Sequence, residues 1–190
     1  MTRLRDASGY RLRAACVAFN STGTHILLVS AAKRVGAWVL PAGGVELGES
    51  AGESALRELW EEAGARAASA GPALFLMNDH AKRARTTFFA ARIDTPLDEL
   101  YPEAKMRTRE WVLLADAPEA LASSPAARAA LVAVWDALVG PRVADKTPEP
   151  TALLAALMGS RSGGGSVGNT DNSDSGNVLP EVHFALESKL

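Results

Sequence analysis

The chain reads Gly43-Gly44-Val45-Glu46-Leu47-Gly48-Glu49 and, after seven further residues, Arg57-Glu58-Leu59-Trp60-Glu61-Glu62-Ala63-Gly64-Ala65. Five acidic residues stand in these two segments, among glycines that permit tight turns. The first segment has the composition of a loop, whereas the second has the spacing of a helical run. Together they predict a glycine-rich loop that leads into an acidic helix.

The sequence marks both ends of this helix. Ser50 is the predicted N-cap, with Glu53 three residues later as its capping-box partner. Gly64 is a natural helix stop. Apolar residues recur between them at helical spacing and form one stripe, which consists of Leu56, Leu59, Trp60 and Ala63.

The opposite face of the helix carries Glu58, Glu61 and Glu62 within an arc of roughly 100°. Residues three and four apart are neighbours on a helix, so these carboxylates repel each other. Mg²⁺ prefers hard oxygen ligands and would relieve the repulsion. The alternative is a solvated acidic face, which many helices have. The spacing of Gly43 and Gly44 before Glu49 and Arg57 favours a metal site over this alternative. We also expect Arg57 to anchor the helix to the loop by pairing with Glu49.

The two segments resemble the Nudix box, Gly-x5-Glu-x7-Arg-Glu-U-x-Glu-Glu-x-Gly-U, in which U is a bulky apolar residue. Every fixed position matches, and the one departure is the small Ala65 at the last position. The resemblance covers about residues 9–140 and implies an α/β fold, the Nudix-type α/β/α sandwich with a mixed β-sheet. It also implies hydrolysis of a phosphoanhydride by water with the help of Mg²⁺ or Mn²⁺.

The same resemblance implies roles for individual residues of the box. Glu58 and Glu62 are the expected metal ligands, helped by a backbone carbonyl of the Gly43 loop. Glu61 is the candidate base that deprotonates or orients the attacking water, and Arg57 is expected beside it as a catalytic residue. Members of the family differ in which glutamate is the base, so the division of roles among the three stays open.

Basic residues gather in five short patches of the first 144 residues, and these patches hold twelve of the twenty basic residues. They are Arg3/Arg5, Arg11/Arg13, Lys33/Arg34, Lys82/Arg83/Arg85 and Lys105/Arg107/Arg109. Such patches suit a small polyanionic substrate, and the alternative for each is ordinary surface charge. We expect no nucleic acid as the main partner, because basic, aromatic-studded low-complexity sequence is lacking.

Outside the box the chain resembles one Nudix branch, the diphosphoinositol polyphosphate phosphohydrolases, which also cleave diadenosine polyphosphates. Residues 10–16, 27–30, 38–44, 85–86 and 107–111 carry this resemblance. It implies a set of residues that face the polyphosphate, namely Arg11, Arg13, Lys33, Gly43, Gly44, Lys82, Arg83, Arg85, Arg107 and Arg109. Several point charges and bidentate arginines are what a ring or chain with many phosphates needs.

Two positions depart from this branch, since Ala42 replaces a glycine and Ala84 replaces a histidine. Either change could weaken the binding of inositol pyrophosphates relative to dinucleotides. Two alternative functions stay open. One is another Nudix pyrophosphatase activity, on nucleoside diphosphate sugars, NADH or coenzyme A derivatives. The other is polyphosphate binding without hydrolysis, which the complete set of box glutamates disfavours.

Apolar runs elsewhere predict a small mixed sheet between helices. The expected strands are residues 14–19, 25–30, 38–40, 73–77, 86–93 and 109–114. A short helix is expected at residues 116–122. A longer one is expected from Ser124-Pro125 to the stop at Gly140-Pro141.

The single cysteine, Cys16, excludes an internal disulfide and lies in an apolar run that predicts a core position. No apolar stretch approaches the roughly 20 residues that span a membrane. The charged first residues are unlike a signal peptide. We therefore expect no membrane partner.

The sequence changes in character after Pro141. Residues 141–158 predict a short extension with a helix-compatible apolar stretch, and residues 159–190 predict a flexible, low-complexity, disordered C-terminal tail. The last three residues, Ser188-Lys189-Leu190, match the tripeptide that the peroxisomal import receptor reads. We expect that receptor as a partner and the peroxisome or glycosome matrix as the location. The alternative is a chance match, with a location in the cytoplasm and nucleus.

Overall fold

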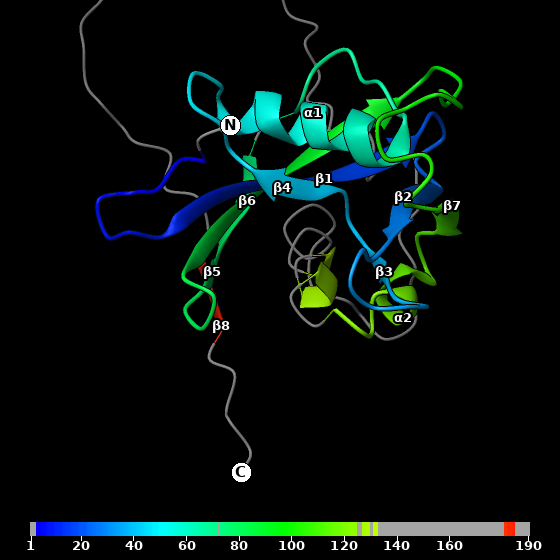
Figure 1. Cartoon of the computed structure of the whole chain (residues 1–190). Helices are drawn as coiled ribbons and strands as arrows, with labels where there is room; N and C mark the ends of the chain where they lie inside the picture. Colours follow the sequence, from blue (N-terminus) through cyan, green and yellow to red (C-terminus); the bar gives the residue numbers. More distant parts are fainter. Residues whose placement is uncertain (1–2, 72, 125–126, 130, 133–180, 185–190) are drawn as a thin grey trace, which may run out of the picture.

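The computed structural model describes residues 3–71, 73–124, 127–129, 131–132 and 181–184. In this part of the chain a sheet runs through the centre, with α1 (Ala51–Ala63) on one face and α2 (Ala117–Ala120) on the other (Figure 1). The strands are β1 (Arg11–Asn20), β2 (His25–Ser30), β3 (Trp38–Val39), β4 (Ala42–Gly44), β5 (Ala73–Asp79), β6 (Ala84–Ile93), β7 (Arg109–Leu113) and β8 (Glu181–Phe184). The described residues contain no helix with both the length and the apolar character needed to cross a membrane.

The sheet is mixed, as the sequence predicts. In the described residues its strands follow the order β3-β2-β1-β6-β5-β8, with β4 paired to β1 and β7 paired to β2. β1 runs parallel to β6 over its whole length, from Arg11 beside Ala84 to Asn20 beside Ile93. β8 runs parallel to β5, and the remaining pairs are antiparallel.

The central strand β1 packs into two separate cores, one on each face of the sheet. The core under α1 includes Leu59 and Ala63 of the predicted apolar stripe. The other core lies on the α2 face and includes Leu121 and Leu131. Side chains alternate along a strand, so Ala14, Cys16 and Ala18 enter the first core and Ala15, Val17 and Phe19 enter the second. The α/β/α order of layers is therefore confirmed.

The ends of α1 are fixed by the residues that the sequence predicts. The Ser50 hydroxyl accepts a hydrogen bond from the Glu53 amide at 3.2 Å, and the Glu53 carboxylate accepts one from the Ser50 amide at 2.7 Å. Gly64 has the left-handed conformation, with φ of 61°. A Cβ at Gly64 would also stand 2.5 Å from the Asp98 carbonyl oxygen. Glycine is thus required there by conformation and by close packing.

One strand in the centre of the molecule departs from the sequence prediction. Residues 42–44 are predicted as part of a loop, but they form β4, in which Gly43 lies beside Ala14 of β1. The run Ala-Gly-Gly has little intrinsic preference for a strand. Pairing with the long strand β1 therefore decides its conformation.

The C-terminal predictions fall mostly on residues that the structure does not describe. The tail predicted for residues 159–190 needs a correction at Glu181–Phe184, which form β8 beside residues 76–79 of β5. Its Glu-Val-His-Phe sequence alternates polar and apolar residues, which is a strand pattern that the small, polar composition of residues 159–177 obscures. Residues 127–129 and 131–132 of the predicted long helix are helical. The rest of that helix, the extension at 141–158 and Ser188-Lys189-Leu190 lie outside the described residues.

Cys16 is fully buried in the core under α1, as the sequence predicts. Burial raises the pKa of its thiol to about 12, so the reactive thiolate is scarce in the folded protein at neutral pH. We expect iodoacetamide to leave Cys16 unmodified in buffer and to alkylate it fully in urea, as measured by mass spectrometry. Rapid alkylation in buffer would contradict this burial.

Candidate functional site

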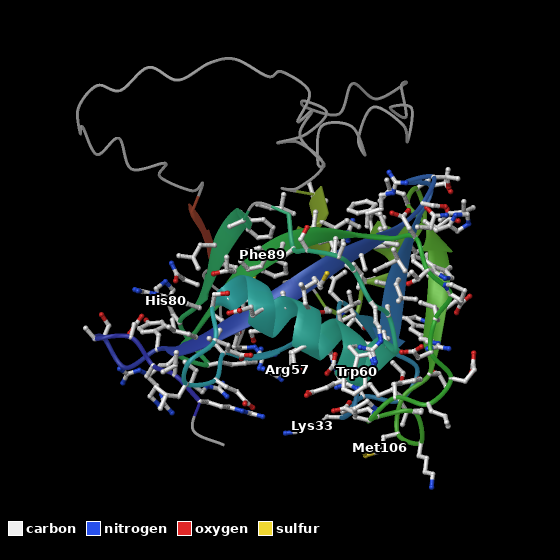
Figure 2. The ribbon with its side chains drawn as sticks, turned by 90° about the horizontal axis from the view of Figure 1, so that it is seen from above. Lys33, Arg57, Trp60, His80, Phe89 and Met106 are labelled. Carbon is white, nitrogen blue, oxygen red and sulfur yellow. The ribbon has the colours of Figure 1, made fainter. Side chains whose placement is uncertain are left out.

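Arg57 ties the acidic helix to the loop before it. Its guanidinium donates to the two carboxylate oxygens of Glu49 at 2.8 and 3.0 Å and to the Gly44 carbonyl at 3.0 Å. It also donates to Glu58 at 2.9 Å and to Glu61 at 3.1 Å. Figure 2, which looks down on α1, shows Arg57 at the edge of this helix. The predicted pair between Arg57 and Glu49 is confirmed.

Loss of Arg57 is expected to destabilise the fold. Arg57→Ala leaves Glu49 and Glu58 without their cation, although their side chains are only 17% and 12% exposed. Hydrogen bonds to charged groups contribute about 1.5–3 kcal/mol each, so we expect the free energy of unfolding to fall by about 3 kcal/mol in urea titrations. The control is Arg92→Ala, because Arg92 pairs with Asp94 at the exposed surface and such pairs contribute about 0–1 kcal/mol. Equal loss in both variants would contradict the anchoring role.

Glu58 lies directly over the backbone of Gly43. A Cβ at Gly43 would stand 1.8 Å from Glu58 Oε1, so only glycine leaves room for this carboxylate. Burial raises the pKa of Glu58, although Arg57 acts in the opposite direction. The protein therefore compensates the charge of this carboxylate only in part.

Glu62 is the most buried of the three glutamates on this face, at 4% exposed. One of its oxygens accepts a hydrogen bond from the Ala42 amide at 3.1 Å, and the other pairs with Arg107. Burial raises the pKa of Glu62 to about 7, even though Arg107 and the Ala42 amide favour the ionised form. Arg107 is held in turn by Glu103 at 2.5 Å and by the Ser30 carbonyl at 2.8 Å.

Glu58 and Glu62 fit a divalent cation by their chemistry. Carboxylate oxygens are ligands that Mg²⁺ and similar hard cations prefer. Burial disfavours the charged form of both, so a nearby cation would stabilise both. In the described residues, no three His, Cys, Asp or Glu side chains converge on one point. The two carboxylates instead contact Arg57 and Arg107, and they remain predicted ligands.

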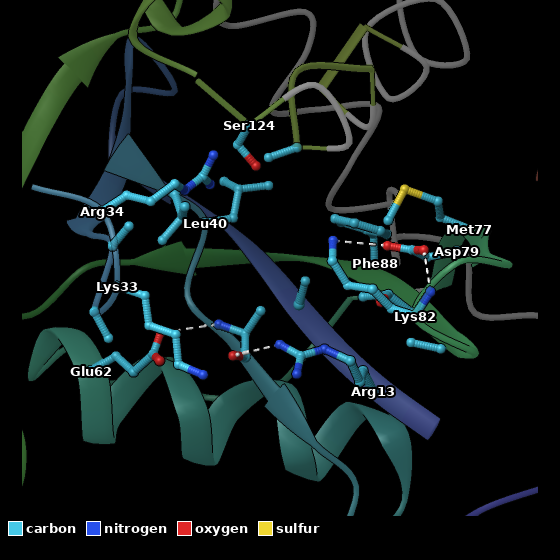
Figure 3. Close-up of a pocket in the computed structure, with 18 of the residues that line it drawn as sticks. Arg13, Lys33, Arg34, Leu40, Glu62, Met77, Asp79, Lys82, Phe88 and Ser124 are labelled. Carbon is cyan, nitrogen blue, oxygen red and sulfur yellow. Dashed lines mark hydrogen bonds and ion pairs between the residues drawn. The ribbon is translucent and has the colours of Figure 1, made fainter. Parts of the chain in front are cut away.

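The peptide of Ala42 joins the acidic helix to a cavity of about 440 Å³. Its amide donates to Glu62, and its carbonyl accepts a hydrogen bond from Arg13 at 3.1 Å, as the dashed lines in Figure 3 show. Burial lowers the pKa of Arg13, while the charge of Glu58 acts to raise it. Glu62, which itself lines the cavity, is therefore joined through one residue of backbone to Arg13, a cation of the same cavity.

Three neighbouring strands form the floor of this cavity. Because side chains alternate along a strand, residues two apart on each strand face the same side. Residues that lie side by side across these strands form rows on the floor. In the order β1, β6, β5 the rows are Arg11-Ala84-Asp79, Arg13-Thr86-Met77 and, on β1 and β6 alone, Ala15-Phe88. The floor is thus cationic on β1, neutral on β6, and mixed on β5.

Half of the residues that are predicted to face a polyphosphate line the cavity. They are Arg11, Arg13, Lys33, Lys82 and Arg107. Gly43 and Gly44 belong to β4 and contact α1 instead, through Glu58 and Arg57. The remaining three residues, Arg83, Arg85 and Arg109, contact protein groups outside the cavity.

Arg83 and Arg85 contact the segment before β1 rather than the cavity. Arg85 is an odd-numbered residue of β6, so it lies on the face opposite to Ala84, and it pairs with Asp6 at 2.8 Å. Arg83 donates to the Ser8 carbonyl at 2.7 Å. Neither residue lines the cavity, and their contact with substrate stays a prediction.

Arg109 binds the C-terminal end of α1. Its guanidinium donates to the carbonyls of Ala63 and Asp98 at 2.7 and 2.6 Å. It also pairs with Glu99 at 2.9 Å and lies 4.9 Å from the ring of Tyr101. A cation at the end of a helix is stabilising by its interaction with the last carbonyls. The sequence reveals the charge of Arg109 but not this partner.

Sequence reasoning missed several uncharged residues of the cavity, among them Met77, Thr86 and Phe88, and one of its two acids, Asp79. The alternation of small, polar and aromatic residues along 84–88 is a usable signal, since every second residue of a strand shares a face. Asp79 gives no signal, because one acid near a basic patch resembles ordinary surface charge.

Comparison with known protein families identifies the family to which the chain belongs. The NUDIX domain model matches residues 9–132. Diphosphoinositol polyphosphate phosphohydrolase 2 of Rattus norvegicus is 34% identical over 122 residues, which are 63% of this chain and 68% of that protein. Diphosphoinositol polyphosphate phosphohydrolase 3-beta of Homo sapiens is 34% identical over 123 residues, which are 63% of this chain and 74% of that protein.

A solved structure shows the same fold. It comes from work on MutT of Aliivibrio salmonicida and Vibrio cholerae, and it is 23% identical with a TM-score of 0.50. The match covers 64% of this chain and 92% of that chain. The chain therefore belongs to the Nudix family, whose hydrolases use divalent metal ions.

Proposed function

We propose that this chain uses Mg²⁺ or Mn²⁺ to hydrolyse phosphoanhydride bonds in diphosphoinositol polyphosphates, diadenosine polyphosphates or both. The observation that carries the proposal is the pair of hydrogen bonds made by the backbone of Ala42. Its amide donates to Glu62, and its carbonyl accepts from Arg13. Carboxylates for a metal ion and cations for a polyanion meet there. The names of the relatives, which are diphosphoinositol polyphosphate phosphohydrolases, support this substrate class.

Each glutamate of the helix has a distinct role in this proposal. Glu58 and Glu62 are the metal ligands, together with a backbone carbonyl of the Gly43 loop. A bound divalent cation supplies charge neutralisation on the phosphates and lowers the pKa of the attacking water. Glu61 is the base, because its side chain is 33% exposed and is the most accessible of the three. Arg57 holds Glu58 and Glu61 in position.

The cations of the cavity bind the rest of the polyphosphate. Arg13 and Arg107 are the two that contact the acidic helix or its neighbour Ala42. In this proposal they stabilise the charge that develops on the leaving phosphate, and fixed cations in that position lower the barrier. Lys33, Lys82 and Arg11 line the cavity farther out and contribute to substrate binding.

A substrate panel tests this proposal directly. The full chain is assayed with Mg²⁺ or Mn²⁺ on a diphosphoinositol polyphosphate, Ap5A, Ap6A, a nucleoside diphosphate sugar, NADH and coenzyme A, with products separated by ion exchange. We expect turnover of the first two classes, loss of all turnover in EDTA, and recovery on addition of Mg²⁺ or Mn²⁺. Turnover confined to the last three compounds would replace the proposed substrate. Tight binding without any product would indicate a binding module instead.

A further inference from the structure

Arg107 is shared between two carboxylates that come from different parts of the chain. Its Nη2 pairs with Glu62 of α1, and its Nε donates to Glu103 at 2.5 Å. Its Nη1 donates to the Ser30 carbonyl at 2.8 Å. The Arg107 side chain is only 11% exposed, yet it lines the cavity. The orientation of the guanidinium therefore decides which of its N–H groups a ligand in the cavity can reach.

Glu103 is itself fixed against the acidic helix. Its amide donates to the carbonyl of Glu61, in the last turn of α1, at 3.0 Å. Its own carbonyl accepts a hydrogen bond from the Arg107 amide at 2.9 Å, so one turn of backbone joins Glu103 and Arg107. The Glu103 side chain is 30% exposed and is not part of the cavity lining. Its contact with the cavity residues therefore runs through Arg107.

The guanidinium of Arg107 is divided between its two carboxylates. Nε and Nη2 form the edge of an arginine that can bind one carboxylate through two parallel hydrogen bonds. Here Glu103 takes Nε and Glu62 takes Nη2. Within the described part of the chain, the contacts to Glu103, Ser30 and Glu62 leave a second N–H on each terminal nitrogen. Those two groups are the ones that Arg107 can offer to a phosphate.

Without Glu103, the same edge of Arg107 would be open to Glu62 alone. A bidentate pair would turn Arg107 towards α1, neutralise more of its charge and occupy the Glu62 carboxylate. Both partners would then be less available, Arg107 to a phosphate and Glu62 to a cation. Glu103 therefore has a consequence for the site although it lies outside the cavity.

We propose that Glu103 is a positioning residue, which holds Nε of Arg107 so that the guanidinium faces the cavity and keeps a single contact with Glu62. This inference rests on the proposed function and adds a residue to its polyphosphate site. Glu103 itself touches no substrate in this arrangement. Its effect on a polyanion runs through Arg107 and is opposite in sign to the effect of its own charge.

Binding of inorganic tripolyphosphate to the full chain, titrated by calorimetry without metal, tests this role. Glu103→Ala removes an anion, so the change of charge alone would make a polyanion bind more tightly. Positioning predicts the opposite, and we expect the affinity to fall at least fivefold. Glu103→Gln keeps an oxygen that accepts from Nε, so it should bind at least as tightly as the unmodified chain. Unchanged or tighter binding by Glu103→Ala, or an equal loss in Glu103→Gln, would overturn the inference.

The matched control is Glu99→Ala. Glu99 lies in the same segment between β6 and β7 and also pairs with an arginine, Arg109. Its side chain is 89% exposed and lies outside the cavity. The affinity of Glu99→Ala for tripolyphosphate is expected to stay within twofold of that of the unmodified chain.

A double-mutant cycle separates positioning from general support of this segment. In an Arg107→Ala background Glu103 has no guanidinium to hold, so Glu103→Ala should change the tripolyphosphate affinity less than twofold. An equal loss with and without Arg107 would show that Glu103 acts through the fold and would overturn the inference. Midpoints of urea unfolding, measured for each variant, establish that folded proteins are compared.

A measurement on the unmodified chain guards against a folding defect in Glu103→Ala. A hydrogen-bonded N–H exchanges slowly with water, so nitrogen-15 NMR should show a slowly exchanging Nε–H for Arg107, assigned by its loss in Arg107→Lys. Because Glu103 holds Nε while a phosphate takes the terminal nitrogens, this signal should persist when tripolyphosphate saturates the site. Rapid exchange, before or after saturation, would contradict the role of Glu103.

The outcomes separate this inference from the proposed function, since none of these experiments needs turnover. Absence of hydrolysis of every anhydride would contradict the proposed function, and the tripolyphosphate titrations would still decide the role of Glu103. Hydrolysis of the proposed substrates, combined with unchanged affinity in Glu103→Ala, would overturn the inference and leave the proposed function standing.

Discussion

Glu58→Gln and Glu62→Gln are each expected to lower kcat/KM about a thousandfold, which corresponds to about 4 kcal/mol of transition-state stabilisation. Glutamine keeps the shape of the side chain but removes the charge that holds a divalent cation. In Glu62→Gln the amide oxygen still accepts the hydrogen bond from Ala42, so the fold is expected to survive. The measurement is steady-state hydrolysis of Ap5A at saturating Mg²⁺, with circular dichroism as the check on folding.

The control for this pair is Glu119→Gln, because Glu119 is exposed on α2 and does not line the cavity. Its kcat/KM is expected to stay within twofold of that of the unmodified chain. If Glu62→Gln kept full turnover at saturating Mg²⁺, its assignment as a metal ligand would be wrong. Full activity of Glu58→Gln would likewise contradict the assignment of Glu58.

Gly43→Ala is expected to lower kcat about a hundredfold while the protein still folds. The added methyl group would stand 1.8 Å from Glu58 Oε1 and 1.9 Å from Glu58 Cδ. The carboxylate is the flexible end of a side chain, so it moves away instead of unfolding the helix. A displacement of about 1 Å at a reacting centre can cost about a hundredfold in rate. The measurement is kcat for Ap5A, together with the midpoint of urea unfolding.

Gly52→Ala is the matched control for Gly43→Ala. Gly52 is the second residue of α1, and a Cβ there would meet Ala70 at 3.5 Å and Phe89 at 3.7 Å, which are ordinary contacts. Alanine loses less backbone entropy than glycine in a helix, by at most about 0.5–1 kcal/mol, so this variant should be at least as stable as the unmodified chain and fully active. Equal kcat in Gly43→Ala and Gly52→Ala would show that the position of the Glu58 carboxylate does not matter.

The acidic helix is the part of the fold that could be predicted most completely from sequence. Its ends depend on local chemistry, namely the Ser50 and Glu53 capping box and the left-handed Gly64, and local chemistry is visible in sequence. The same holds for the pair between Arg57 and Glu49, because the two residues are only eight apart in the sequence. Pairing partners of strands are not local, which explains why the sequence predicts a loop where β4 forms.

In the candidate site, too, local features could be predicted from sequence and tertiary contacts could not. Residues of one type, such as Arg107 and Arg109, cannot be told apart from composition, yet one pairs with Glu62 and the other binds carbonyls at the end of α1. On β6 the register with β1 decides that Ala84 faces the cavity and that Arg85 does not. The sequence therefore predicts which charges exist, and the tertiary register decides which of them share a cavity.

The central claim is that Glu58 and Glu62 together bind the divalent cation beside Gly43. The most direct measurement is an anomalous difference map from crystals soaked in Mn²⁺. We expect a peak bounded by the two carboxylates, and that peak should vanish in Glu58→Gln crystals soaked in the same way. A strong peak elsewhere, with the two glutamates still paired to Arg57 and Arg107, would contradict the claim.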